Sequence, residues 1–288
     1  MDTPHTDLDV EPYRPRLFGI AYRMLGDAAE AEDLVQETFL RWHQADQAAI
    51  AAPEGWLVAV VSRLAIDRLR KAATERTTYV GPWLPEPIAT DPRDGADYAT
   101  ELASDLSMAL LVLLERLAPE ERAAFLLREV YDVRYDEIAR ILSMSEPAAR
   151  QMVHRARTRV RADRARFTPA PDAHERLLHR FLAALEADDQ EALLAVFADD
   201  VTLMSDGGGK VSAARNVVRG PERIARMLLG VERKWGALVT HRLRRVNGEL
   251  ALVSYFGDRV VMTTTVHGDG DRIGAVYRVL NPEKLRHV

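Results

Sequence analysis

Apolar residues recur at helical spacing along the first part of the chain. They form three stripes with the i, i+3, i+4 and i+7 intervals of amphipathic helices. The stripes are Leu17, Ile20, Ala21, Met24 and Leu25; Leu34, Val35, Thr38, Phe39 and Trp42; and Trp56, Leu57, Val60, Val61, Leu64 and Leu69. Asp27 and Glu30 have the spacing of a capping box, and Pro53 suits a first helical turn. The pattern predicts an all-α domain over residues 1–73.

Prolines and acidic residues characterise the next stretch, residues 74–104. It contains Trp83-Leu-Pro-Glu-Pro87 and an acidic run from Asp91 to Glu101. This composition predicts a linker. Helical spacing resumes at Ser107, breaks at Pro119 and stops near Pro171. Residues 105–167 are therefore predicted to form a second all-α helical domain.

The periodicity becomes mixed over residues 168–288. Helices are expected at 173–187, 190–198 and 221–235, and alternating β-branched segments predict strands at 201–204, 239–246, 250–256, 259–267 and 272–280. Gly268-Asp-Gly-Asp271 is expected as a hairpin turn. The fold class is thus multidomain, with two all-α helical domains followed by an α+β domain.

Composition narrows the chemistry. The 288 residues include no cysteine, which excludes disulfides, thiolate metal sites and thiol nucleophiles. A net charge of -5 means that nucleic-acid binding would need locally clustered bases. No apolar run approaches the ~20 residues of a membrane span, and the N-terminus has acids and prolines where a signal peptide has a basic start. We expect a cytoplasmic protein without a membrane partner.

A helix-turn-helix is predicted between residues 135 and 161. A short helix over 135–142 is followed by the turn Ser143-Met-Ser145 and a second helix with the stripe Ala149, Val153, Ala156 and Val160. The polar face of this second helix is basic. Its candidate contacts to promoter DNA are Arg150, Gln151, His154, Arg155, Arg157 and Arg159. The alternative is an ordinary solvated helix whose arginines only keep it soluble.

Two helices of the first domain carry opposite charge. Residues 27–37 hold five acids and no base, whereas residues 63–76 hold five bases against two acids. The helix macrodipole alone accounts for acids near a helix start and bases near its end. Charge by itself therefore leaves structural and functional interpretations open.

The order of these segments resembles the extracytoplasmic-function sigma factors of RNA polymerase. Residues 33–42 (DLVQETFLRW) resemble their core-polymerase-binding helix, residues 56–70 (WLVAVVSRLAIDRLR) their promoter-melting segment, and the helix-turn-helix their reader of the minus-35 element. The resemblance covers residues 11–166. It implies core-polymerase contacts at Asp33, Gln36, Glu37 and Phe39, and minus-10 contacts at Arg63, Asp67, Arg68, Arg70 and Lys71. The implied partners are core RNA polymerase, through its β′ and β subunits, and promoter DNA.

Two positions depart from the family pattern. Ser62-Arg63 stands where an Arg-Asn pair is common, and Met152 where the recognition helix often carries arginine. The promoter sequence therefore stays open.

The C-terminal domain resembles the SnoaL-like branch of the cone-shaped fold of nuclear transport factor 2. One subgroup of these sigma factors carries such a domain together with three motifs, present here as residues 83–87 (WLPEP), 206–210 (DGGGK) and 281–285 (NPEKL). The resemblance implies an intramolecular contact of this domain with the linker and the sigma domains. The interdomain regulatory residues would be Trp83, Leu84, Pro85, Asp206, Gly207, Gly208, Gly209, Lys210, Asn281, Pro282, Lys284 and Leu285.

A catalytic role for this domain is the alternative. His241, His267, Asp206 and Asp258 offer acid or base groups, but their spacing matches no recognisable motif. Residues 206–210 lack the spacing and the following Ser or Thr of a phosphate-binding loop. We expect no catalytic residue, no cofactor and no metal. The chain is interpreted as a sigma factor modulated by its own C-terminal domain; the rival is a SnoaL-like enzyme or small-molecule-binding module fused to a helix-turn-helix repressor.

Overall fold

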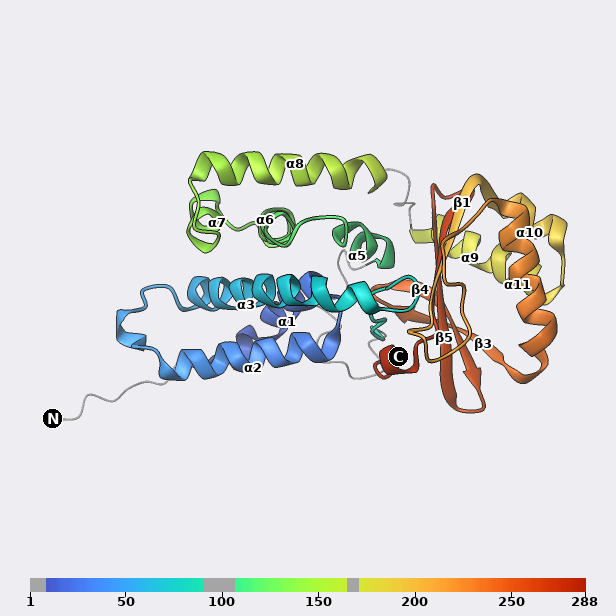
Figure 1. Ribbon diagram of the computed structural model, residues 1–288, viewed down its shortest axis with the longest axis horizontal. Helices are drawn as coiled ribbons and strands as arrows, with labels where there is room; N and C mark the ends of the chain where they lie inside the picture. The colour runs from blue at the N-terminus through green and yellow to red at the C-terminus, as the bar shows by residue number, and fades with distance from the viewer. Residues whose placement is uncertain (1–8, 91–106, 165–170) are drawn as a thin grey trace.

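The computed structural model describes residues 9–90, 107–164 and 171–288. Figure 1 shows the helical part of the chain on one side and a sheet-containing domain on the other, with the C-terminal tail at their junction. The helices are α1 (Arg14–Leu25), α2 (Ala28–Gln44), α3 (Pro53–Glu75), α5 (Met108–Leu114), α6 (Pro119–Glu129), α7 (Tyr135–Ile141), α8 (Glu146–Arg164), α9 (Pro171–Glu186), α10 (Gln190–Val196) and α11 (Pro221–Trp235). The strands are β1 (Phe197–Asp206), β2 (Val218–Arg219), β3 (Thr240–Val246), β4 (Glu249–Phe256), β5 (Arg259–Gly268) and β6 (Ile273–Val279).

The first domain consists of α1, α2 and α3. Gly26 ends α1 in the left-handed conformation, with φ 68°, which glycine adopts without steric cost. Asp27 caps α2 by accepting a hydrogen bond from the Glu30 amide at 3.0 Å. Trp42 is buried and packs edge-on against Trp56 of α3, with 5.6 Å between the rings. The predicted stripes therefore form the interior of this bundle.

The second domain, α5 to α8, packs directly on the first. Ser107, where the sequence predicts helices to resume, caps α5, and Pro119 starts α6 after the predicted break. The short turn between α7 and α8 places Ser143 at φ 56°, and the stripe from Ala149 to Val160 is buried. Because α1 and α3 contact α6, one apolar core runs through both helical domains. The acidic part of the linker, residues 91–101, lies outside the described residues.

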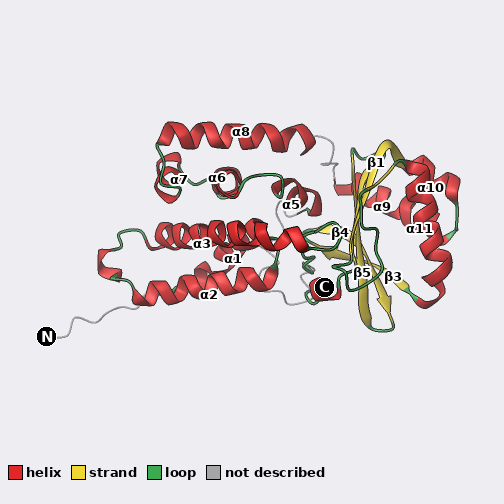
Figure 2. Ribbon diagram, in the orientation of Figure 1, coloured by secondary structure: helices red, strands yellow, loops and turns green. Residues whose placement is uncertain are grey.

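The C-terminal domain is a six-stranded sheet in the order β2-β1-β6-β5-β4-β3. β1 and β6 pair in parallel and the other neighbours are antiparallel. α9, α10 and α11 cover one face of this sheet, where Phe181, Leu203 and Val276 are buried. The other face carries Ala275, Tyr277 and Val279 against α5 and the linker. The helix and sheet layers are separate in Figure 2, and the predicted multidomain fold class is confirmed.

One strand prediction is corrected, and one short strand was not predicted. β1 already begins at Phe197, where Phe197 pairs with Ile273, whereas the sequence predicts helix to residue 198. A register irregularity follows, and the polar residues Asp199 and Asp200 within it hide the strand from a pattern based on alternation. β2 has two residues, which is too short for periodicity to reveal. In the described chain, no helix is long and apolar enough to cross a membrane.

A buried polar pair links α5 to the outer face of the sheet. Oε1 of Glu249 accepts a hydrogen bond from the Met108 amide at 3.1 Å and lies 3.3 Å from Nε2 of His267. Burial raises the pKa of Glu249 to about 8 and, with a smaller contribution from His174, lowers the pKa of His267 to about 3. Both groups are therefore neutral at pH 7, which removes the cost of burying a charge beside α5.

This pair predicts a pH-dependent stability. Between the ordinary pKa of 4.5 and about 8, the folded protein keeps a proton on Glu249 that the unfolded chain has lost, so the free energy of unfolding falls as pH rises. His267 acts oppositely, but only below its ordinary pKa of 6.5. We expect stability to fall between pH 6.5 and 8, by at most ~1.4 kcal/mol per pH unit.

Glu249→Gln keeps an acceptor for the Met108 amide but does not titrate, so its urea unfolding should show less of this decline than wild type. Glu191→Gln, at an exposed position, is the control and should retain the wild-type decline. Parallel pH profiles for wild type and Glu249→Gln would contradict the assignment.

Candidate functional site

The Asp206 carboxylate is fully buried and accepts four hydrogen bonds. Oδ1 accepts from the Tyr79 hydroxyl at 2.6 Å and from the Gly208 amide at 3.0 Å. Oδ2 accepts from the Leu84 amide at 2.9 Å and from Nζ of Lys284 at 2.8 Å. We call Tyr79, Leu84, Asp206 and Lys284 the linker lock. It unites three segments that lie far apart in the sequence.

The neighbours of Asp206 strengthen this arrangement. Nζ of Lys284 also donates to the Leu84 carbonyl and lies 4.0 Å from the centre of the Trp83 ring, a cation–π distance. The side-chain amide of Asn281 donates to the Tyr79 hydroxyl at 3.1 Å. Burial, and then the hydrogen bond to Asp206, raises the pKa of the Tyr79 phenol, so it remains a donor. Each buried polar atom of the linker lock named above therefore has a hydrogen-bond partner.

The glycines that follow Asp206 allow close approach of the chain. Gly208 has φ 57°, and a β-carbon there would lie 2.3 Å from Nδ2 of Asn281. Gly209 has φ 70°, and a β-carbon there would meet Val80 at 3.1 Å. At Gly207 a β-carbon would lie 2.7 Å from the Val211 carbonyl oxygen. Larger residues would push the turn away from the tail and the linker.

The same linker is bound to the first domain. The Glu86 amide donates to the Gly26 carbonyl at 2.8 Å, and the Glu86 carboxylate accepts from the Ala28 amide at 2.8 Å. The Tyr22 hydroxyl donates to the Glu86 carbonyl at 2.5 Å. A β-carbon at Gly26 would lie 2.7 Å from the Trp83 ring, so Trp83 packs against the turn that separates α1 and α2.

Asn247 completes a bridge between the first and third domains. It is 1% exposed; its Nδ2 donates to the Tyr22 hydroxyl at 3.0 Å, and its Oδ1 accepts from the Ile88 amide at 2.7 Å. Sequence reasoning missed Tyr22 and Asn247, and it included Glu86 only as a member of the motif 83–87. The signal for Asn247 was only that of a hairpin turn, since Asn-Gly commonly forms one, and nothing local marks Tyr22 as a partner of a residue 225 positions away.

The other predicted regulatory residues lie around the lock. Pro85 and Leu285 are buried, the latter in the apolar cluster with Leu84 and Tyr277. Pro282 opens a short 3-10 turn that Asn281 caps. Lys210 differs because it is exposed and pairs with Glu283 at 3.2 Å on the surface.

The predicted polymerase-binding residues differ in their exposure to solvent. Asp33 and Gln36 are exposed on α2, and Glu37 is half-buried in a pair with Arg41 at 2.6 Å. Phe39 is 7% exposed and its ring centre lies 5.0 Å from the Arg14 guanidinium. It belongs to the apolar stripe of α2, so most of its side chain is covered.

Two of the predicted minus-10 residues, Arg63 and Arg70, contact the second domain. Arg63 donates from its guanidinium to the Ile141 carbonyl at 3.0 Å and to the Arg140 carbonyl at 2.9 Å, at the C-terminal end of α7. Arg70 donates to Glu120 of α6 and to Asp67, and Arg68 pairs with Glu30 at 2.9 Å. Lys71 is exposed. Most of this basic segment is thus engaged within the protein.

The predicted minus-35 residues line the polar face of α8. Arg150 stacks 4.4 Å from the centre of the Tyr135 ring and pairs with Glu146. Arg157 pairs with Glu129 at 2.5 Å, and Arg159 pairs with Glu121 at 2.5 Å. The remaining three, Gln151, His154 and Arg155, are exposed.

The candidate catalytic groups do not converge. Asp206 belongs to the linker lock, Asp258 is exposed in the β4–β5 turn, and His267 lies beside Glu249. His241 contacts Ser254 at 2.9 Å and Glu232 at 3.4 Å on the helix-covered face. Within the described ranges, no group of three or more His, Cys, Asp or Glu side chains is arranged to hold a metal ion.

Comparison with known proteins identifies three domains. Residues 10–75 match Sigma-70 region 2, residues 107–160 match Sigma-70 region 4, and residues 178–282 match a SnoaL-like domain. The chain is 39% identical to the ECF RNA polymerase sigma factor SigJ of Mycobacterium tuberculosis, over 96% of this chain and 92% of that protein. It is 30% identical to a protein named "Probable ECF RNA polymerase sigma factor SigI" of the same species, over 95% and 92% of the two chains. The crystal structure of M. tuberculosis SigJ superposes with a TM-score of 0.78 and 36% identity, covering 95% of each chain.

The linker lock predicts a large stability loss on losing the Asp206 charge. Asp206→Asn would place an amide group where the ammonium of Lys284 and the Leu84 amide both donate, which leaves a buried charge unpaired. We expect a loss of about 3–5 kcal/mol in the free energy of unfolding, measured by urea denaturation. Lys210→Ala removes an exposed ion pair from the same turn and should change stability by no more than ~1 kcal/mol. Equal effects of the two substitutions would contradict this assignment.

Proposed function

Because this chain belongs to the extracytoplasmic-function sigma factors of RNA polymerase, we propose that its C-terminal domain modulates its activity by holding the linker between the two helical domains. The family acts in transcription initiation, where sigma factors bind core polymerase and promoter DNA. The observation that carries the proposal is the Asp206 carboxylate, which binds Leu84 of the linker and Lys284 of the tail at once. A linker held in this way fixes the spacing of its two flanking domains.

The contacts with core polymerase follow from exposure. We assign them to Asp33, Gln36 and Glu37 on α2, without Phe39, and expect the β′ subunit to receive this surface and the β subunit to receive the helix-turn-helix domain. Exposed carboxylates steer association with a positively charged partner and help to specify its orientation. We place the protein in the cytoplasm together with the polymerase.

Promoter binding would require the two helical domains to separate. Arg63, which the resemblance assigns to the minus-10 element, is bound to the end of α7, and Arg70 is bound to α6. The exposed ion pair of Arg70 with Glu120 contributes little to stability. Both arginines could exchange these internal contacts for phosphate contacts. Separating the apolar core that the two helical domains share costs more free energy than breaking these polar contacts. An interaction that favours one arrangement of the two domains therefore changes the activity. The linker lock is such an interaction.

A non-catalytic role for the C-terminal domain is part of the proposal. Asp206 is fully engaged by four donors, and the other candidate acid and base groups are distributed over both faces and an edge turn of the sheet. General acid–base catalysis needs such groups within hydrogen-bond reach of one substrate.

Removal of the tail from Asn281 onward tests the proposal. Without Lys284 and Asn281 the lock loses the ammonium and the amide that satisfy Asp206 and Tyr79. We expect run-off transcription with purified core polymerase to change several-fold while the start site is retained. Lys210→Ala should transcribe like wild type. Transcription by the truncated protein at the wild-type level would contradict the proposed modulation.

Charge reversal on α2 tests the polymerase contact. Asp33→Lys with Glu37→Lys should weaken binding to core polymerase at least tenfold, since like charges would then oppose each other at the interface. The matched control is Glu222→Lys with Glu191→Lys, two exposed acids of the C-terminal domain, with the fold of each variant checked by circular dichroism. Capture of core enzyme by the folded α2 variant at the wild-type level would remove α2 from the interface.

A further inference from the structure

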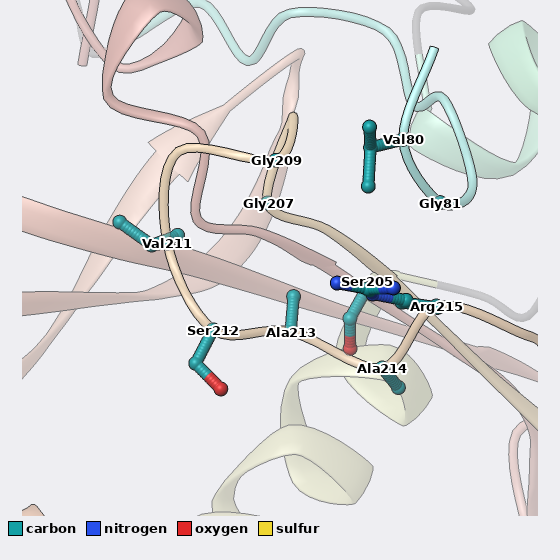
Figure 3. A pocket seen from close by; sticks show the side chains of 10 residues that line it. All are labelled: Val80, Gly81, Ser205, Gly207, Gly209, Val211, Ser212, Ala213, Ala214 and Arg215. Carbon is teal, nitrogen blue, oxygen red and sulfur yellow. The ribbon is translucent and has the colours of Figure 1, made fainter. Parts of the chain in front are cut away.

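A small polar pocket lies where the linker meets the turn after β1. Its walls come from three segments: the linker, the end of β1 and the loop that follows it (Figure 3). The lining residues are Val80, Gly81, Ser205, Gly207, Gly209, Val211, Ser212, Ala213, Ala214 and Arg215. The pocket is therefore shared between the C-terminal domain and the linker that it holds.

The lining carries positive charge without a carboxylate. Arg215 is the one charged residue of the ten that line the pocket, and among the described residues it forms no ion pair. Figure 3 shows its side chain extending from the loop toward Ser205. The carboxylate of Asp206, the nearest acid in sequence, is turned to Tyr79, Leu84 and Lys284 instead.

A second arginine, Arg278, lies on the strand next to Ser205, with the Glu232 carboxylate near enough to interact with its charge. Ser205 pairs with Arg278 in the β1–β6 ladder, so both side chains project from the same face of the sheet. Arg278 is 6% exposed, and its guanidinium donates to the sulfur of Met262 at 2.7 and 3.1 Å, which is a weak acceptor. Burial lowers the pKa of Arg278 to about 10, against the opposing effect of Glu232, so Arg278 is charged at pH 7 and Glu232 offsets part of that charge.

The pocket also offers hydrogen-bond donors that the protein does not use. Ser205 is 3% exposed and lines the pocket, yet within the described part of the chain its hydroxyl has no partner. The same is true of the backbone amides from Ser212 to Arg215 in the adjoining loop. Hydroxyl groups, backbone amides and a guanidinium are the groups that proteins direct at oxyanions.

We propose that this pocket binds a small oxyanion, of the size of inorganic phosphate, between Arg215, Ser205 and the linker at Val80–Gly81. The inference rests on the proposed function and names the ligand class through which it would be regulated. A cavity of about 130 Å³ is below the ~300 Å³ of drug-sized sites but well above the ~10–15 Å³ needed for one water. An anion in contact with both sides stabilises the docked linker relative to the free one.

The test uses the full chain and sodium phosphate, titrated by calorimetry against sodium chloride of equal ionic strength. We expect saturable binding, together with slower hydrogen–deuterium exchange of the linker segment 79–90. Arg215→Gln should weaken the binding at least tenfold. Ala214→Glu, which puts a carboxylate into the pocket, should abolish both effects. An acetate titration distinguishes a carboxylate ligand from a phosphoryl one, because only the bound class slows the exchange.

Arg223→Gln is the matched control, since it removes one exposed positive charge from α11 outside the pocket and should bind phosphate like wild type. If Arg215→Gln binds phosphate as tightly as wild type, the inference is overturned. That result would be expected if the phosphate were bound by the basic recognition helix α8. The absence of any effect on linker exchange would also overturn the inference. Either result leaves the linker lock and its effect on transcription untouched, because those are tested by tail removal without added ligand.

Discussion

The organisation of this molecule depends on the burial of one carboxylate, that of Asp206. An unpaired carboxylate in a protein interior costs several kcal/mol, so Asp206 is stable there only when its donors are present. Those donors belong to the linker, the glycine-rich turn and the tail. The linker therefore cannot leave the C-terminal domain without exposing or stranding this charge. A local electrostatic requirement thus determines the path of a segment that connects two other domains.

The held linker has consequences for the helical part of the chain. Tyr22 and Gly26 of the first domain bind the linker at Glu86, two residues after Leu84, so the first and third domains are joined through it. The helix-turn-helix domain packs against both, through the core shared with α1 and α3 and through α5 on the sheet. In this arrangement the basic groups of α3 bind carbonyls and acids of α6 and α7. Arg63 and Arg70, which we propose to contact DNA, thus serve as internal contacts.

Much of the fold could be predicted because it follows from local periodicity. The bounds of α11 at Pro221 and Trp235 and the buried stripe of α8 agree with the pattern of apolar residues. β2 and the start of β1 could not be predicted in this way, since one is very short and the other passes through Asp199 and Asp200. For the site, the resemblance pointed to the three motifs that the structure brings into contact at Asp206. Tyr22 and Asn247 could not be predicted, because their role depends on a contact between residues far apart in the sequence.

The linker is recognised largely through its main chain. Asp206 and Lys284 bind the amide and the carbonyl of Leu84, Tyr22 binds the carbonyl of Glu86, and Asn247 binds the amide of Ile88. The backbone amides of Ala89 and Thr90 donate in addition to the carbonyls of His287 and Arg245. Since every residue type except proline supplies both of these groups, these contacts hold the path of the main chain but do not by themselves select a linker sequence. Selectivity is left to the few linker side chains that are also bound: Trp83 against Lys284, Leu84 in the apolar cluster and Glu86 at the Ala28 amide.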